Sequence, residues 1–144
     1  MKVFRLCDKN EIELILTQKS FSNIGHECEI CSTKNTHTYI PGKKYLHFFE
    51  KEISLLYLFL KESTFVCIYD IPKDILNQTK GVGYYLNFIN FTHLDEVTEY
   101  AIESEQVEFN YLKQVYAVKF DLDFDYIPSI EDIFNNLDII YNLN

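Results

Sequence analysis

Arginine is almost absent from this 144-residue chain: Arg5 is the only one, and all other basic residues are lysines. The 13 basic residues face 22 acidic ones, which gives a formal net charge of −9 at pH 7. This balance argues against direct nucleic-acid binding and against an anionic membrane surface, and it leaves a basic protein partner open. Lysine cannot replace arginine where a planar, two-pronged donor must hold a phosphate or carboxylate. Arg5 therefore has two explanations, the codon bias of an AT-rich genome or a specific anion contact.

Glycine and proline are also scarce, with four and three residues, and tryptophan is missing. Because no Pro-rich or Gly-rich linker divides the chain, we expect a single domain over residues 1–144. No apolar run approaches membrane-spanning length and no signal peptide is visible, so we expect a cytoplasmic protein with no membrane partner. The four cysteines are then expected to be free thiols in a reducing compartment.

Local patterns predict helices early in the chain and strands mostly later. Asp8 and Glu11 form a capping-box pattern that predicts a helix ending near Lys19. Residues 20–42 are polar and contain turn formers, which predicts a long irregular loop. We expect strands over 2–6, 44–49, 64–69, 84–89, 99–102 and 112–120. We expect further helices over 50–61 and 72–77, and a C-terminal one with an apolar stripe of Ile130, Ile133, Phe134 and Leu137. This succession predicts an α+β fold.

Two short motifs match only part of the pattern of a known binding site. Cys28 and Cys31, flanked by His26 and His37, have the residue types of a tetrahedral zinc site. Their spacing departs from that of a zinc knuckle, because no well-separated second pair follows. We therefore expect no metal site, and a zinc-stabilised binding module is kept as an alternative. The segment 81–83, Gly-Val-Gly, lacks the context of a dinucleotide fingerprint and is expected to be a loop.

A dispersed set of residues carries a resemblance to a known family. The set comprises Arg5, His47, Phe48, Phe49, Tyr57 and Glu99. Their order resembles that of the ADP-ribosyltransferase superfamily. In that family, a first strand bearing Arg or His leads into a helix, an aromatic strand leads into a helix with a Tyr, and a late strand opens with a catalytic Glu. The resemblance spans residues 2–120 and is one of pattern.

The resemblance implies a fold, a reaction and a catalytic residue. The fold would be α+β, with split β-sheets around a cleft and flanking helices. The activity would be that of an NAD-dependent mono-ADP-ribosyltransferase with a macromolecular acceptor, and NAD would be its substrate. Glu99 would stabilise the oxocarbenium-like charge that develops as nicotinamide leaves. Val97 stands where arginine-modifying members carry Glu or Gln, so the acceptor stays open.

The other five residues of the set would bind NAD by the same resemblance. Arg5 would hold the phosphates or ribose of NAD, and His47 would lie in the same binding site. Phe48 or Phe49, together with Tyr57, would enclose the nicotinamide ring by stacking.

A non-enzymatic function is the main alternative. The net charge of −9 and the small size also suit an acidic interaction protein, of the phage or mobile-element inhibitor type, that docks on a basic protein surface.

Overall fold

The structure, a computed structural model, describes residues 1–27, 43–50, 65–77, 80–86, 94–118, 135 and 137–142. Of residues 26–27, 80–86, 94–97 and 118 it describes the backbone. The strands are β1 (Lys2–Cys7), β2 (His26–Glu27), β3 (Lys44–Phe49), β4 (Phe65–Asp70), β5 (Lys80–Leu86), β6 (Leu94–Glu103), β7 (Leu112–Val118) and β8 (Leu137–Asn142). The helices are α1 (Lys9–Gln18) and α2 (Lys73–Asn77), with 3₁₀ turns at Ser104–Gln106 and Phe109–Tyr111.

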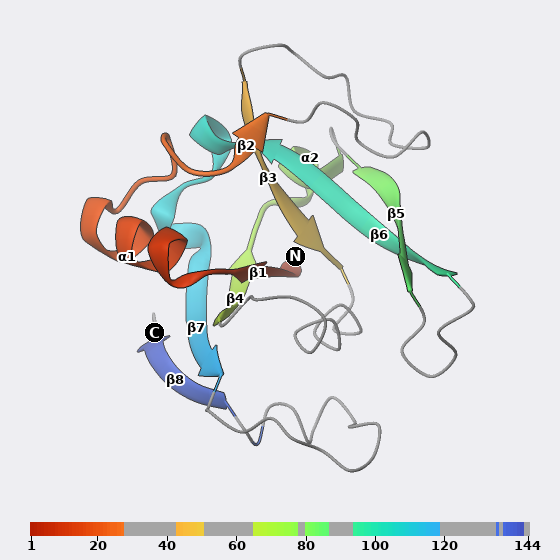
Figure 1. Cartoon of the computed structure of the whole chain (residues 1–144). Helices are drawn as coiled ribbons and strands as arrows, with labels where there is room; N and C mark the ends of the chain where they lie inside the picture. The colour runs from red at the N-terminus through yellow and green to blue at the C-terminus, as the bar shows by residue number, and fades with distance from the viewer. Residues whose placement is uncertain are drawn as a thin grey trace.

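All eight strands belong to one antiparallel sheet. Its order is β5-β6-β3-β1-β4-β7-β8, and β2 pairs with β3 off this path. Figure 1 shows β3 and β6 side by side, with α1 lying to one side of the strands. The predicted α+β fold with split sheets around a cleft is therefore wrong: the described part of the chain is predominantly β and forms a single sheet.

The central strand β1 is paired very unequally with its two neighbours. It runs against β4 over its whole length, from Lys2 opposite Asp70 to Cys7 opposite Phe65. It meets β3 at a single register position, where Phe4 faces Phe49. The two-residue strand β2 pairs with the start of β3. Since β6 takes one edge of β3, β2 and β1 share the other edge and leave a gap in the ladder between them.

Helix α1 follows the predicted capping pattern. The Asp8 side chain accepts a hydrogen bond of 2.9 Å from the backbone N–H of Glu11, which satisfies one of the free donors at the helix start. The helix ends where Lys19 takes a left-handed conformation with φ of 54°. Ile12 and Ile15 are buried against the sheet, so the predicted helix is confirmed.

Apolar side chains are buried on both faces of the central strands. On the face covered by α1, the core includes Val3, Cys7, Leu46, Phe48, Cys67, Tyr69, Tyr100 and Ile102. The opposite face buries Phe4, Tyr45, Val66, Ile68 and Ala101. Burial on both faces explains the continuous apolar runs of β1 and β4.

Two parts of the second half depart from the predicted elements. The segment 81–83, expected as a loop, lies inside β5 and pairs with 97–99 of β6. The predicted helix stripe does not reach Leu137, which is the first residue of β8. In both places pairing with a neighbouring strand overrides the local preference of the sequence. The predictions for 28–42, for residues 51–61 of the helix expected over 50–61, and for 129–134 fall outside the described residues.

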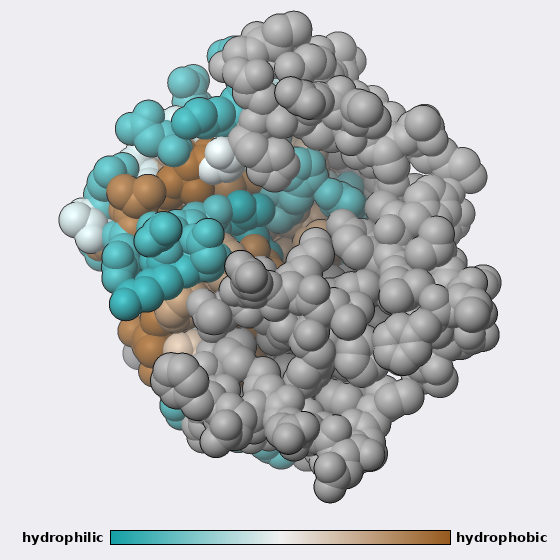
Figure 2. Space-filling view, in the orientation of Figure 1, coloured by the Kyte–Doolittle hydropathy of each residue, from teal (hydrophilic) through white to brown (hydrophobic). Residues whose placement is uncertain are grey.

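Among the residues that the structure describes, three large apolar side chains are exposed. Leu14 on α1 is 41% exposed, and Ile139 and Ile140 on the edge strand β8 are 54% and 47% exposed. Figure 2 shows polar and apolar side chains next to each other on the side of the molecule where α1 lies. Over the described ranges, no helix combines the length and the apolar character needed to cross a membrane.

We predict that Gly25→Ala destabilises the protein. Gly25 has a φ of +95°, and a Cβ there would lie 2.5 Å from the carbonyl oxygen of Tyr45 and 3.0 Å from Ser104 Oγ. Because the nearest atom belongs to a backbone, we expect the free energy of unfolding to fall by about 2 kcal/mol. Urea unfolding measures this loss. The control Asn23→Ala changes an exposed side chain and is expected to stay within about 0.5 kcal/mol of wild type. Equal stability of Gly25→Ala and wild type contradicts the prediction.

Candidate functional site

The Arg5 guanidinium is buried and holds three acceptors inside the protein. Its Nε and Nη2 donate to the two carboxylate oxygens of Glu11 at 3.0 and 2.5 Å. Its Nη1 donates to the carbonyl oxygen of His47 at 3.1 Å. Burial by itself lowers the pKa of Arg5, yet the charge and hydrogen bonds of Glu11 outweigh it and leave the pKa raised. The guanidinium therefore stays charged, and each of its three nitrogens donates a hydrogen bond.

These contacts lie where the backbone ladder between β1 and β3 is interrupted. The His47 carbonyl sits on β3 between the part paired with β2 and the single pair with β1. A carbonyl in such a gap needs a donor, because an unpaired buried backbone group is costly. Arg5 supplies that donor and, through Glu11, also ties α1 to the sheet.

His47 and Glu99 form an acid–base pair across β3 and β6. His47 Nε2 lies 3.7 Å from Glu99 Oε1, and the two side chains are only 14% and 13% exposed. Glu99 is directly opposite Phe49, and Phe49 is opposite Phe4 on β1. Cross-strand partners project to the same face of a sheet. The His47 imidazole, the Glu99 carboxylate and the Phe49 ring therefore share one face at the junction of three strands.

Phe48, also predicted to stack on the nicotinamide ring, does not join this face. It is fully buried on the opposite face, where its ring meets Tyr69 edge-on at a centroid distance of 5.0 Å. Tyr57 lies outside the described residues. Of the two predicted phenylalanines, Phe49 is therefore the one that accompanies Glu99.

A second pair of a basic and an acidic side chain lies further along the same face. In both pairs the glutamate on β6 is opposite the residue two positions after its basic partner. Lys43 Nζ lies 3.9 Å from Glu103 Oε2, and Glu103 is opposite Tyr45, two residues along from Lys43. These side chains are 45% and 24% exposed. Electrostatic interactions weaken as water enters, so solvent screens the ion pair between Lys43 and Glu103.

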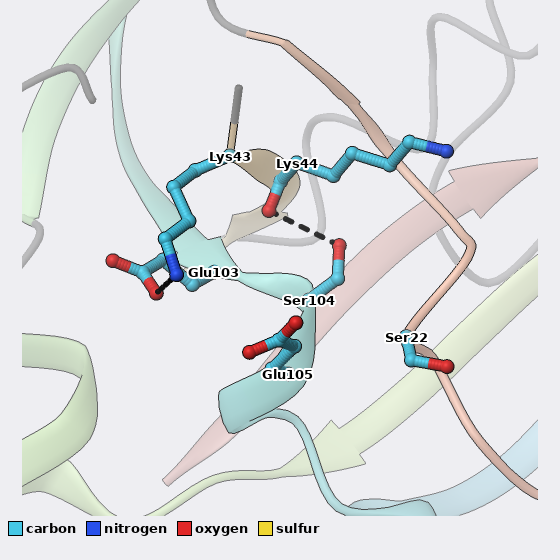
Figure 3. A pocket seen from close by; sticks show the side chains of 6 residues that line it. All are labelled: Ser22, Lys43, Lys44, Glu103, Ser104 and Glu105. Carbon is cyan, nitrogen blue, oxygen red and sulfur yellow. Dashed lines mark hydrogen bonds and ion pairs between the residues drawn. The ribbon is translucent and has the colours of Figure 1, made fainter. Parts of the chain in front are cut away.

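The exposed pair borders a small polar cavity of about 150 Å³. Its lining residues are Ser22, Lys43, Lys44, Glu103, Ser104 and Glu105, and Figure 3 shows them from close by. The Ser104 hydroxyl donates to the Ile24 carbonyl at 2.5 Å and lies 3.2 Å from that of Lys44. The Lys44 ammonium donates to the Asn23 carbonyl, 3.5 Å away. Figure 3 shows the Lys44 side chain pointing away from Lys43 and Glu103. Most polar groups that line the cavity therefore pair with other protein groups or point away from it.

Two buried thiols lie beside the Arg5 contacts. Cys7 Sγ and Cys67 Sγ are 3.5 Å apart on neighbouring strands, and both residues are free thiols. The hydrogen bond with Cys67, together with burial, raises the pKa of Cys7 far above its ordinary value. Tyr69 is also fully buried, and its hydroxyl has no hydrogen-bond partner among the described residues. Burial raises the pKa of Tyr69, so this phenol remains neutral.

The proposed zinc ligands fall largely outside this region. His26 opens β2, while Cys28, Cys31 and His37 are not among the described residues. Within the ranges that the structure describes, no group of three or more His, Cys, Asp or Glu side chains could hold a metal ion.

Glu11 is the important residue that sequence analysis misses. The capping box predicts that its carboxylate turns back to the helix start, whereas the carboxylate binds Arg5. The sequence does contain a signal for this contact. An arginine lies on a buried strand, and the helix that follows directly has a glutamate in its first turn. Both arrangements use the same Glu, so the pattern alone does not choose between them.

No protein-family model matches the sequence, and comparisons with curated proteins and with solved structures find no similar protein.

We predict strong coupling between Arg5 and Glu11. Arg5→Leu or Glu11→Leu alone leaves a buried charge unpaired, and each should lower the free energy of unfolding by about 3–5 kcal/mol. The double variant should lose clearly less than the sum, because both charges are gone. Denaturant unfolding of all four proteins gives the coupling energy.

Glu13→Gln is the matched control for this cycle. It removes a carboxylate from the same helix, but that carboxylate pairs with Lys9 at 3.8 Å in solvent, with side chains 62% and 75% exposed. We expect a change below about 0.5 kcal/mol. Strictly additive losses at Arg5 and Glu11 contradict the proposed coupling.

We also predict that Cys7 and Cys67 resist alkylation in the native protein. Burial keeps the reagent away from both side chains, and the raised pKa of Cys7 keeps its reactive thiolate scarce near pH 8. Iodoacetamide labelling followed by peptide mass spectrometry should detect both modifications only after unfolding in concentrated guanidinium chloride. Rapid labelling of either cysteine before unfolding contradicts this prediction.

Proposed function

We propose that this protein cleaves NAD and transfers its ADP-ribose to a macromolecular acceptor, with Glu99 as the catalytic carboxylate. The observation that carries the proposal is the placement of Glu99 beside His47 and opposite Phe49. Residues expected to act together are far apart in the sequence and lie on one face of adjacent strands. Because the strands of the described part of the chain form one sheet, the resemblance is limited to the site itself.

The chemistry follows from the position of the carboxylate. When the bond between the ribosyl C1′ and nicotinamide breaks, positive charge develops on the ribose. A carboxylate that is only 13% exposed interacts with this charge more strongly than one in open water. The Phe49 ring, opposite Glu99, offers a flat surface for the departing nicotinamide.

Arg5 contributes indirectly in this proposal. Its Nε, Nη1 and Nη2 atoms already donate to Glu11 and to the His47 carbonyl. It therefore fixes the position of β3, and with it His47, rather than holding the phosphates of NAD. The phosphate-binding role expected from the sequence stays a prediction without support from these contacts.

We predict that Glu99→Gln lowers nicotinamide release from NAD by at least about 100-fold, because the amide cannot stabilise positive charge as a carboxylate does. Chromatographic measurement of nicotinamide tests this, with circular dichroism to verify folding. Glu103→Gln is the matched control, since it removes a carboxylate from the same face of the same strand. It should retain most of the activity. A folded wild-type protein that neither binds nor cleaves millimolar NAD contradicts the proposed function.

A non-enzymatic role is the second proposal, and the net charge of −9 supports it. A basic protein partner would then bind with an affinity that falls as salt rises. Such binding should be the same for wild type and Glu99→Gln, whereas the enzymatic proposal requires Glu99.

A further inference from the structure

We infer that His47 is a second catalytic residue, a base that takes the proton of the incoming acceptor, and that the acceptor reacts through a group that must lose a proton, such as a hydroxyl. The inference rests on the proposed function and specifies the acceptor that the resemblance leaves open. Its basis is the pairing of an imidazole with the carboxylate assigned to the ribosyl charge.

The position of His47 suits a base in this reaction. Its Nε2 lies 3.7 Å from Glu99 Oε1, and both side chains project from adjacent strands to the same face. A carboxylate that stabilises charge on C1′ lies next to that carbon. A neighbouring imidazole is then within reach of the atom that attacks the same carbon, which is the geometric requirement for general base catalysis.

The proton transfer also keeps positive charge next to Glu99. The bond between C1′ and the nicotinamide nitrogen breaks, and its electron pair leaves with the nitrogen and cancels the positive charge there. The acceptor oxygen forms a bond to C1′, and its proton passes to His47. The imidazolium so formed is stabilised by Glu99, as the ribosyl carbon was before. The proton is then released to solvent, which balances the reaction.

This arrangement selects the acceptor by its chemistry. A thiolate or a carboxylate attacks without losing a proton, so it has no use for a base. A hydroxyl group must lose one at neutral pH, as must an amine or a guanidinium, and histidine is the side chain whose ordinary titration range allows it to accept a proton there. The other pair on this face, Lys43 with Glu103, contains no imidazole.

The charged groups around His47 set its surroundings. Those of the described residues on its face are Glu99 and Glu103 from β6, Lys43 just before β3, Lys2 from β1, whose ammonium lies 5.3 Å from the Phe4 ring centroid, and Asp70 from β4, which is opposite Lys2. Arg5 approaches from the other face and binds the His47 carbonyl. The Glu99 carboxylate lies 3.7 Å from the imidazole.

The test compares wild type, His47→Gln and Lys43→Gln. Nicotinamide release from NAD is measured between about pH 5 and pH 8, in water and with added methanol. In wild type the rate should fall toward acid pH as the base is protonated. His47→Gln should be slower by about 100-fold at pH 8 and should lose this dependence. Lys43→Gln, which removes the lysine of the other diagonal pair, should keep the wild-type rate and the wild-type dependence on pH.

Azide separates a catalytic role of His47 from a structural one. It is an anionic nucleophile with no proton to lose, so it should raise nicotinamide release by His47→Gln at least about tenfold and affect wild type little. Free ADP-ribose identifies water as the acceptor, and methyl ADP-ribose identifies an alcohol; either product agrees with a hydroxyl oxygen.

Two different failures are distinguishable. If wild type releases nicotinamide and Glu99→Gln does not, the proposed function stands. An unchanged pH profile in His47→Gln, or no azide effect on that variant, then overturns the role of His47 alone. If wild type releases no nicotinamide, the proposed function and this inference fall together.

Discussion

The buried contact of Arg5 with Glu11 and the His47 carbonyl is the constraint on which this structure depends. It connects α1, β1 and β3 where β1 and β3 share only one register position. Removing two charges from water is costly, so such a contact adds little net stability compared with apolar packing. Its contribution is to fix the geometry. Because the guanidinium is planar, it can donate to all three acceptors in only one arrangement of α1, β1 and β3. The Arg5 side chain therefore connects β1 to β3 where the backbone hydrogen bonds between the two strands are interrupted.

The face that carries His47, Phe49 and Glu99 lies on β3 and β6, next to this contact. Alternation along β3 sends Phe48 into the core and Phe49 to the face of Glu99, while the His47 carbonyl turns to Arg5. One six-residue strand thus serves the core, the polar junction and the site at successive positions. The protein places a shielded carboxylate next to an imidazole without the two split sheets that its resemblance implies.

Sequence alone predicts the elements whose signals are local. The cap at Asp8 fixes the start of α1, and the apolar runs of β1 and β4 need no tertiary information. Gly81–Gly83 and Leu137 are assigned wrongly because their strands form by pairing with β6 and β7. The order of His47, Phe49 and Glu99 in the sequence predicts that they act together, and the structure places them on one face. Which of two adjacent phenylalanines faces Glu99, and where the carboxylate of Glu11 turns, depend on register and packing that no local pattern encodes.

The central place of β1 has a consequence for how the chain folds. This strand precedes both of its partners in the chain, and its two contacts join Phe4 to Phe49 and Arg5 to Cys67 across long stretches of sequence. Loop closure of this kind is slow, and unpaired apolar strands promote aggregation while they wait. Local formation of α1 immediately after β1 brings the carboxylate of Glu11 close to Arg5 before either neighbouring strand arrives. The charged pair can thus assemble early, so that the sheet later closes around an arginine that already has its partner.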